Sequence, residues 1–270
     1  MNRPESPPGI PDVQSRPDAR ELAIDRVGIR GLRYPIRFAD GGGEAQSTIA
    51  IFGVYVALPA ERKGTHMSRL VAVIDEQRDP LTVDGLGALL DQMLARLEAT
   101  EGRIEMEFPW FREKTAPVTG VRSMMDYEVK LCADQTAAGR TIAATVIVPV
   151  MSLCPSSKAI ADYGAHNQRS HLTLSIVPRA GEAVALADIV AIAEEESSCE
   201  LYGLLKRADE KYVTERAYDR PRFVEDLVRG MAARLSVDSR LAGFRVAAEN
   251  FESIHNHSAY AEIDRSVETR

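Results

Sequence analysis

The chain has 270 residues, of which 45% are hydrophobic and 27% are charged, and its formal net charge is −7. This length suits two domains of roughly 100–150 residues each, and the composition is that of a soluble globular enzyme. The acidic balance excludes non-specific binding to nucleic acid, because no excess of basic residues is present to neutralise phosphates. The net negative charge is compatible with a local basic pocket that binds a small polyanion.

The three cysteines are too few for a disulfide framework and indicate a reducing compartment. No apolar run approaches the roughly 20 residues of a membrane helix. Residues 1–22 are rich in proline and charge and lack the apolar core of a signal peptide. We therefore expect a flexible N-terminal arm, a cytoplasmic protein and no membrane partner.

The first half of the chain predicts two strands, a helix and two further strands. A turn signal at 40–43 separates the first two strands. Leucine and methionine at helical spacing predict a helix over 86–97, with Asp84 near its start. Runs rich in β-branched and aromatic residues predict the strands, at 27–38, 47–58, 103–111 and 122–133.

The second half repeats this order. Helices are predicted over 187–205 and 221–235, and Asp219 and Pro221 lie near the start of the second. Strands are predicted at 141–151, 171–177, 243–248 and 258–263.

The repeated order predicts an α+β fold of two tandem β–β–α–α–β–β modules with antiparallel sheets. The first module spans 23–137 and the second 138–270, and the repeat is imperfect because the first shows one clear helix. The edge strands of an open sheet have unpaired backbone groups that can bind other chains. Closure of several copies into a barrel removes these edges. The sequence thus favours an oligomer with a pocket between subunits.

Residues 152–171 concentrate groups that suit chemistry. Cys154 follows a predicted strand and precedes Pro155, and Ser156 is a candidate N-cap for a short helix. A thiol near a helix N-terminus has its thiolate favoured, which suits metal ligation or nucleophilic attack, although a buried structural cysteine is an equal alternative. His166 lies in a polar turn, and its spacing from Cys154 is not a recognised zinc pattern, so a solvated histidine stays open. The other two cysteines are interpreted as structural.

Three further segments hold titratable groups. The segment 249–257 (ENFESIHNH) places Glu252 and His255 close together, and function is favoured there over a polar turn. A carboxylate there can accept two parallel hydrogen bonds from a pair of N–H donors. The segment 61–69 can cradle phosphates or form a surface loop. The segment 204–218 is mostly charged and, Glu210 excepted, is interpreted as a solvated helix end or loop.

Five separated segments resemble type B GTP cyclohydrolase I: GTHMSR at 64–69, SLCPSSK at 152–158, YGAHNQRSH at 163–171, LLKRADEKYVTERAY at 204–218 and ENFESIHNH at 249–257. The resemblance implies the tunnelling fold, in which bimodular subunits assemble into barrels. It also implies homotetramers with active sites at subunit interfaces. The implied reaction is hydrolysis of GTP to formate and 7,8-dihydroneopterin triphosphate, the entry to tetrahydrofolate synthesis.

The resemblance also implies roles for individual residues. Cys154, His166 and Glu210 are the implied ligands of a divalent zinc, manganese or iron ion, with Glu200 and Glu215 as alternatives to Glu210. His255 and Glu252 are the candidates for acid/base work, and Glu225 or Glu252 for gripping the guanine edge. The candidates for the triphosphate are Lys63, Arg69, Lys158, Arg169 and His171. Many members of the family carry a second cysteine after the proline, where this chain has Ser156.

Two other functions stay open on the sequence. A tunnelling-fold nitrile reductase of queuosine synthesis would use Cys154 as a nucleophile and NADPH as the hydride donor. A non-catalytic purine- or pterin-binding scaffold is the second alternative. His166 and the segment 249–257 fit a metal hydrolase better.

Overall fold

The computed structural model describes residues 12–14 and 16–266, which are organised around one antiparallel sheet. The sheet follows the order β1-β2-β3-β4-β5-β6-β8-β9, and the short β7 pairs with β5. The strands are β1 (Ile24–Phe38), β2 (Gln46–Leu58), β3 (Gly102–Thr115), β4 (Arg122–Thr136), β5 (Gly139–Leu153), β6 (Asn167–Pro178), β7 (Cys199–Glu200), β8 (Leu241–Asn250) and β9 (Ala259–Arg265). The helices are α1 (Met67–Asp75), α2 (Leu86–Leu97), α3 (Pro155–Ile160), α4 (Leu186–Glu196), α5 (Arg207–Asp219) and α6 (Val224–Ser236).

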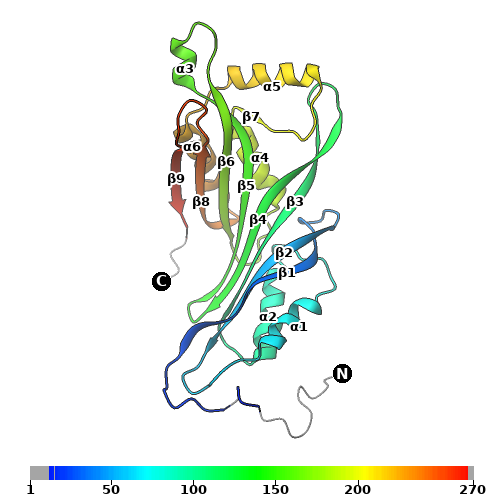
Figure 1. Cartoon of the computed structure of the whole chain (residues 1–270), viewed down its shortest axis with the longest axis vertical. Coiled ribbons are helices and arrows are strands. Elements are labelled where there is room, and N and C mark those ends of the chain that lie inside the picture. Colours follow the sequence, from blue (N-terminus) through cyan, green and yellow to red (C-terminus); the bar gives the residue numbers. More distant parts are fainter. Residues whose placement is uncertain (1–11, 15, 267–270) are drawn as a thin grey trace.

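Three helices cover one face of the sheet. α2 packs against β3 and β4, α4 against β5 and β6, and α6 against β8 and β9. In Figure 1 the upper strands face the viewer, and α4 and α6 lie behind them. Alternate residues of β5, Val146, Val148 and Val150, are buried under this layer, as the period-two pattern of a strand requires. One hydrophobic core extends from Phe38 on β1 to Ala248 on β8.

The predicted antiparallel sheet is confirmed, and each of the eight predicted strands corresponds to a strand of the structure. The first half has the order strand–strand–helix–helix–strand–strand. The second half departs from it, because α3 lies between β5 and β6, and β7 lies between α4 and α5. The expected division after residue 137 falls in the turn between β4 and β5, where Thr136 pairs with Gly139. Hydrogen bonding and the core continue across this turn.

The helices differ from the prediction at three places. α1 was not expected, because only Leu70, Val73 and Ile74 of its nine residues are buried. The helix predicted over 187–205 ends at Glu196, and the chain then pairs with β5 through β7. α5 occupies most of the segment interpreted as a helix end or loop. None of the described helices is long and apolar enough to cross a membrane.

Part of the N-terminal arm is bound to the loop before α1. The Asp18 N–H donates to the Glu61 carbonyl at 3.0 Å, and the Lys63 N–H donates to the Arg16 carbonyl at 3.1 Å. His66 Nε2 lies 3.2 Å from Asp12 Oδ2. This part is therefore held in place where a flexible arm was expected, and residues 1–11 and 15 of the arm lie outside the described residues.

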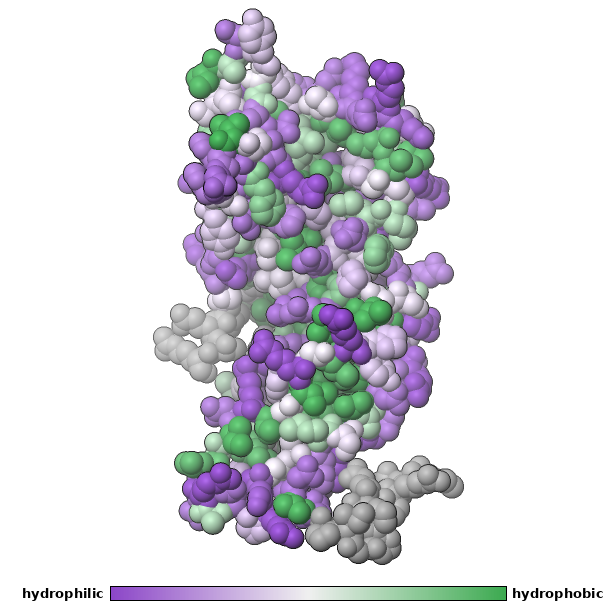
Figure 2. Space-filling view, viewed as in Figure 1, coloured by the Kyte–Doolittle hydropathy of each residue, from purple (hydrophilic) through white to green (hydrophobic). Residues whose placement is uncertain are grey.

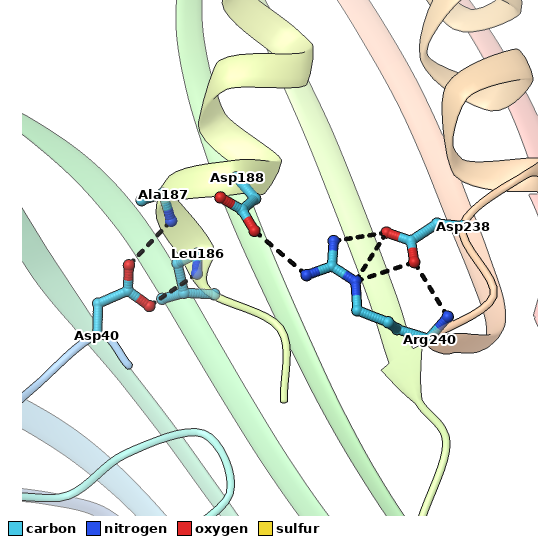
Figure 3. Close-up of polar contacts among 6 residues, drawn as sticks. All are labelled: Asp40, Leu186, Ala187, Asp188, Asp238 and Arg240. Atoms are coloured by element: carbon cyan, nitrogen blue, oxygen red, sulfur yellow. Dashed lines mark hydrogen bonds and ion pairs between the residues drawn. The ribbon is translucent and has the colours of Figure 1, made fainter. Parts of the chain in front are cut away.

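Asp40, in the turn between β1 and β2, caps a helix of the second half of the chain. The N-cap residue of α4 is Ala185, which has no side-chain acceptor. Asp40 supplies the missing acceptor to the backbone N–H groups of Leu186 at 2.7 Å and Ala187 at 2.9 Å (Figure 3). Beside it, Arg240 joins Asp188 of α4 to Asp238 (Figure 3). The start of α4 is thus defined by residues distant in sequence.

Apolar side chains reach the surface on the sheet face turned toward the viewer. Figure 2 shows this as green areas among the polar cover. Ile49 and Ile51 on β2 are 60% and 41% exposed, and with Pro109 and Ile147 they line an open groove of about 510 Å³. Exposed apolar area of this kind is typical of a surface that a partner covers.

Candidate functional site

Cys154 and His166 are brought together by the connection between β5 and β6. β5 ends one residue before Cys154, and β6 begins one residue after His166. The Cys154 N–H donates to the His166 carbonyl at 3.1 Å, and the His166 N–H donates to Ser157 Oγ at 3.2 Å. The antiparallel pairing of two neighbouring strands therefore brings the backbones of Cys154 and His166 together.

Cys154 itself is the N-cap of α3, which corrects the expectation that Ser156 has this role. The Cys154 Sγ accepts a hydrogen bond from the Ser157 N–H at 3.4 Å, and Pro155 occupies the first helical turn. Proline is favoured there because its missing N–H needs no partner.

The imidazole of His166 is held by polar neighbours. Its Nδ1 lies 3.0 Å from Gln168 Oε1 and 3.8 Å from Glu252 Oε2. The side chains of His166 and Glu252 are 14% and 13% exposed. Gln168 is a residue that the motif analysis quoted without assigning a role.

Sulfur and imidazole nitrogen are a donor pair that suits a transition metal. A single copy does not complete the expected three-ligand set: no three His, Cys, Asp or Glu side chains in the described part of the chain form a group that could hold a metal ion. Glu210 is exposed on the first turn of α5. Cys154 and His166 thus fit the implied metal, and the third donor is not beside them.

The two alternative carboxylates are engaged elsewhere. Glu200 lies 3.2 Å from Arg216 and accepts a hydrogen bond from the Tyr202 hydroxyl at 2.6 Å. Burial acts to raise the pKa of Glu200, but the Tyr202 hydroxyl, a backbone hydrogen bond and the charges of Arg216 and Lys114 together outweigh it and hold that pKa below its usual value. Glu215 pairs with Lys211 on α5 and lines an open cavity together with Ala165 and Asn167, the two neighbours of His166 in the chain.

The other two cysteines have the properties of structural residues. Burial raises the pKa of Cys132 to about 11 and, together with Glu200, raises that of Cys199 to about 12. Both thiols therefore stay protonated at neutral pH.

A buried carboxylate beside Glu210 fixes the start of α5. Asp209 accepts hydrogen bonds from the N–H groups of Lys206, Val118 and Thr119, each at 2.9 Å, and from the Thr119 hydroxyl at 2.6 Å. Burial acts to raise the pKa of Asp209, but these hydrogen bonds outweigh it and hold that pKa well below its usual range. The tip of the β3–β4 hairpin is thereby attached to α5.

Asp209→Asn is expected to loosen this attachment, because an uncharged amide is a weaker acceptor and its NH₂ group faces donors. Hydrogen exchange of the Val118 and Thr119 amides should accelerate roughly tenfold or more. Asp40→Asn is the matched control: it weakens the cap of α4 and should leave these two amides protected. Equal protection of both amides in wild type and Asp209→Asn would contradict the attachment.

The triphosphate candidates fall into two separate groups. Arg169 and His171 line an open cavity of about 590 Å³ beside Gln168. Lys158 lies 4.1 Å from the centre of the Tyr218 ring and donates to the Tyr218 carbonyl. Of the other two candidates, Lys63 lies in the loop before α1 and Arg69 lies in α1 itself. α1 is in the lower half of Figure 1, whereas α3 lies at the upper end. One copy does not bring the two groups together.

The remaining candidates lie near the ends of β8 and α6. His255 is exposed, and its ring stacks on that of His257 with 5.1 Å between centroids, while Glu252 turns toward His166. Glu225 is exposed in the first turn of α6. The cavity that Arg169 and His171 line is also lined by Asp126, Glu128 and Tyr202, which sequence reasoning missed. Asp126 and Glu128 stand on β4, far from any motif, and Tyr202 stands two residues before the segment 204–218.

Comparison with known proteins decides the family. The model of the type I GTP cyclohydrolase FolE2 family matches residues 10–261. The chain belongs to this family. It is 55% identical over 264 residues to GTP cyclohydrolase FolE2 1 of Dechloromonas aromatica, covering 97% of this chain and 98% of that protein. It is 55% identical over 261 residues to GTP cyclohydrolase FolE2 of Burkholderia thailandensis, covering 97% and 96%.

Among solved structures, the FolE2-family chain is similar to uricase from Arthrobacter globiformis. The TM-score is 0.52 at 8% sequence identity, and the match covers 91% of this chain and 94% of the uricase chain. At this identity the likeness concerns the fold alone.

Proposed function

We propose that the protein is a metal-dependent GTP cyclohydrolase I, which hydrolyses GTP to formate and 7,8-dihydroneopterin triphosphate. The main support for this proposal is the 55% sequence identity to FolE2 proteins over nearly the whole chain. The backbone hydrogen bond between Cys154, after the end of β5, and His166, before the start of β6, supports it, because a thiol and an imidazole can form part of a metal site suited to hydrolysis.

In this proposal Cys154 and His166 hold a zinc, manganese or iron ion, and Glu210 is the third ligand. The bound ion supplies a Lewis acid that lowers the pKa of water for attack on C8 of guanine. The triphosphate is bound by Arg169, His171 and Lys158. The guanine edge is bound by the carboxylate of Glu225 or Glu252, which accepts its N–H hydrogen bonds. Glu252 and His255 move protons while the ribose opens and rearranges.

The site is proposed to be completed by a second copy of the chain within a homotetramer. Lys63 and Arg69 stand apart from Cys154 in one copy, and so does the third ligand. Exposed apolar side chains support assembly, among them Tyr163 in the turn before His166 and Ile49 on the open sheet face. We propose two tandem modules, 23–137 and 138–270, as the unit of assembly.

The cytoplasm is the proposed location, since a thiol ligand and two structural thiols suit a reducing compartment. Tetrahydrofolate synthesis is the proposed pathway.

The direct test is incubation of the protein with GTP and, in turn, Zn²⁺, Mn²⁺ and Fe²⁺, followed by oxidation. Neopterin fluorescence is the expected product signal, and chelation should abolish it. The absence of product with all three ions would defeat the proposal. The Cys154→Ala variant is the control for contaminating activity.

A further inference from the structure

We propose that Gln168 is a positioning residue which, with Ser152 and Ser170, sets the tautomer of His166 so that Nε2 is free to bind the metal. The inference rests on the proposed function, because it concerns a ligand of the proposed metal site. It assigns a role to three residues that do not themselves touch substrate or metal.

The four side chains form a continuous polar chain between β5 and β6. His166 Nδ1 lies 3.0 Å from Gln168 Oε1, Gln168 Nε2 donates to Ser152 Oγ at 2.8 Å, and Ser152 Oγ lies 2.7 Å from Ser170 Oγ. Gln168 is 7% exposed, and both serines are fully buried. Burying polar groups of this kind costs folding free energy unless every hydrogen-bond partner is in place. The hydrogen-bond network therefore fixes the conformations of the four side chains that form it.

The donor-to-acceptor direction of these hydrogen bonds decides which ring nitrogen of His166 carries the proton. An amide oxygen only accepts, so Nδ1 must be the donor when Oε1 faces it. The reversed amide would present NH₂ to Nδ1 and give the opposite tautomer. Glu252 Oε2, 3.8 Å from the same Nδ1, is a carboxylate and favours a proton there.

With the proton on Nδ1, the Nε2 lone pair of His166 is free. Metal-binding histidines are commonly oriented by a hydrogen bond from the other ring nitrogen, and loss of that partner costs roughly 10–100-fold in metal affinity. Gln168 is in this position relative to His166, and Ser152 keeps the amide from turning over.

The test combines two measurements on the full-length protein. Long-range ¹H–¹⁵N NMR of histidine-labelled, metal-free protein at mildly alkaline pH reads the tautomer of His166 directly. Competition with a chelator gives the affinity for Zn²⁺. Wild type should show the Nδ1–H tautomer. Gln168→Met should shift the population toward Nε2–H and lower Zn²⁺ affinity roughly 10–100-fold.

Two further variants separate positioning from general damage. Gln168→Glu keeps an acceptor for Nδ1–H and should retain the wild-type tautomer and most of the affinity. Ser175→Ala is the matched control, because Ser175 and Thr145 form an equivalent hydroxyl pair, 2.8 Å apart, between the same two strands. It should change neither measurement.

An Nε2–H tautomer in wild type would overturn the inference, as would an unchanged tautomer and affinity in Gln168→Met. His166→Ala distinguishes this failure from failure of the proposed function. Unchanged Zn²⁺ affinity in His166→Ala would defeat the metal site itself. A large loss in His166→Ala with no loss in Gln168→Met would defeat the positioning role alone.

Discussion

Replacement of Cys154 by alanine is expected to abolish tight metal binding and, with it, formation of dihydroneopterin triphosphate. Loss of a direct ligand should weaken Zn²⁺ binding by at least roughly 100-fold, the upper end of the effect of losing an indirect partner. The fold should persist, because the Cys154 side chain lies outside the hydrophobic core and its Sγ accepts one weak hydrogen bond at 3.4 Å. Metal content after dialysis and neopterin fluorescence measure the two effects.

The matched control is Cys132→Ala, which removes a thiol that stays protonated at neutral pH and stands on β4. It should retain metal and activity. Unchanged metal content in Cys154→Ala would show that the thiol is not a ligand. The role of Cys154 as a covalent nucleophile would then have to be considered again.

Two inactive variants should restore activity when their subunits are mixed. Cys154→Ala removes a proposed metal ligand at the α3 end of the molecule, and Arg69→Ala removes a cation in α1, in the other half of the molecule. If each site takes these residues from different copies, random mixed tetramers regain about a quarter of the sites intact. Activity after co-refolding of equal amounts of both variants measures this.

A mixture of Cys154→Ala with Lys158→Ala provides the control. Both residues belong to the same end of one copy, since Lys158 is in α3 and Cys154 is its N-cap. Each site in that mixture lacks one group or the other, so no gain over the residual activity of Lys158→Ala is expected. Equal recovery in both mixtures, or recovery in neither, would contradict a site shared between copies.

The strands could be predicted because their buried residues alternate over long runs. The start of β6 was missed by four residues for an instructive reason. The alternation continues there through Gln168 and Ser170, which are buried but polar, so no hydrophobic pattern marks them. One of these two positions, Gln168, contacts the proposed metal ligand His166, and the other, Ser170, is linked to Gln168 through Ser152.

α5 could not be predicted from periodicity, because only Asp209, Val213 and Ala217 of its 13 residues are buried. Its start depends on hydrogen bonds from the β3–β4 hairpin to Asp209, across about 90 residues of sequence. Likewise, no local signal could reveal that Asp40 caps α4.

The sequence by itself determined the antiparallel sheet and the family, because strand periodicity is local and five separated motifs in order are specific. It also identified Cys154 and His166 as candidates. Only the tertiary structure decided that these two residues meet, that Gln168 and Glu252 approach the imidazole, and that Lys63 and Arg69 lie apart from them. The physical reason is that strand pairing and hairpin docking set the distances between side chains, and neither is encoded in the spacing of residues along the chain.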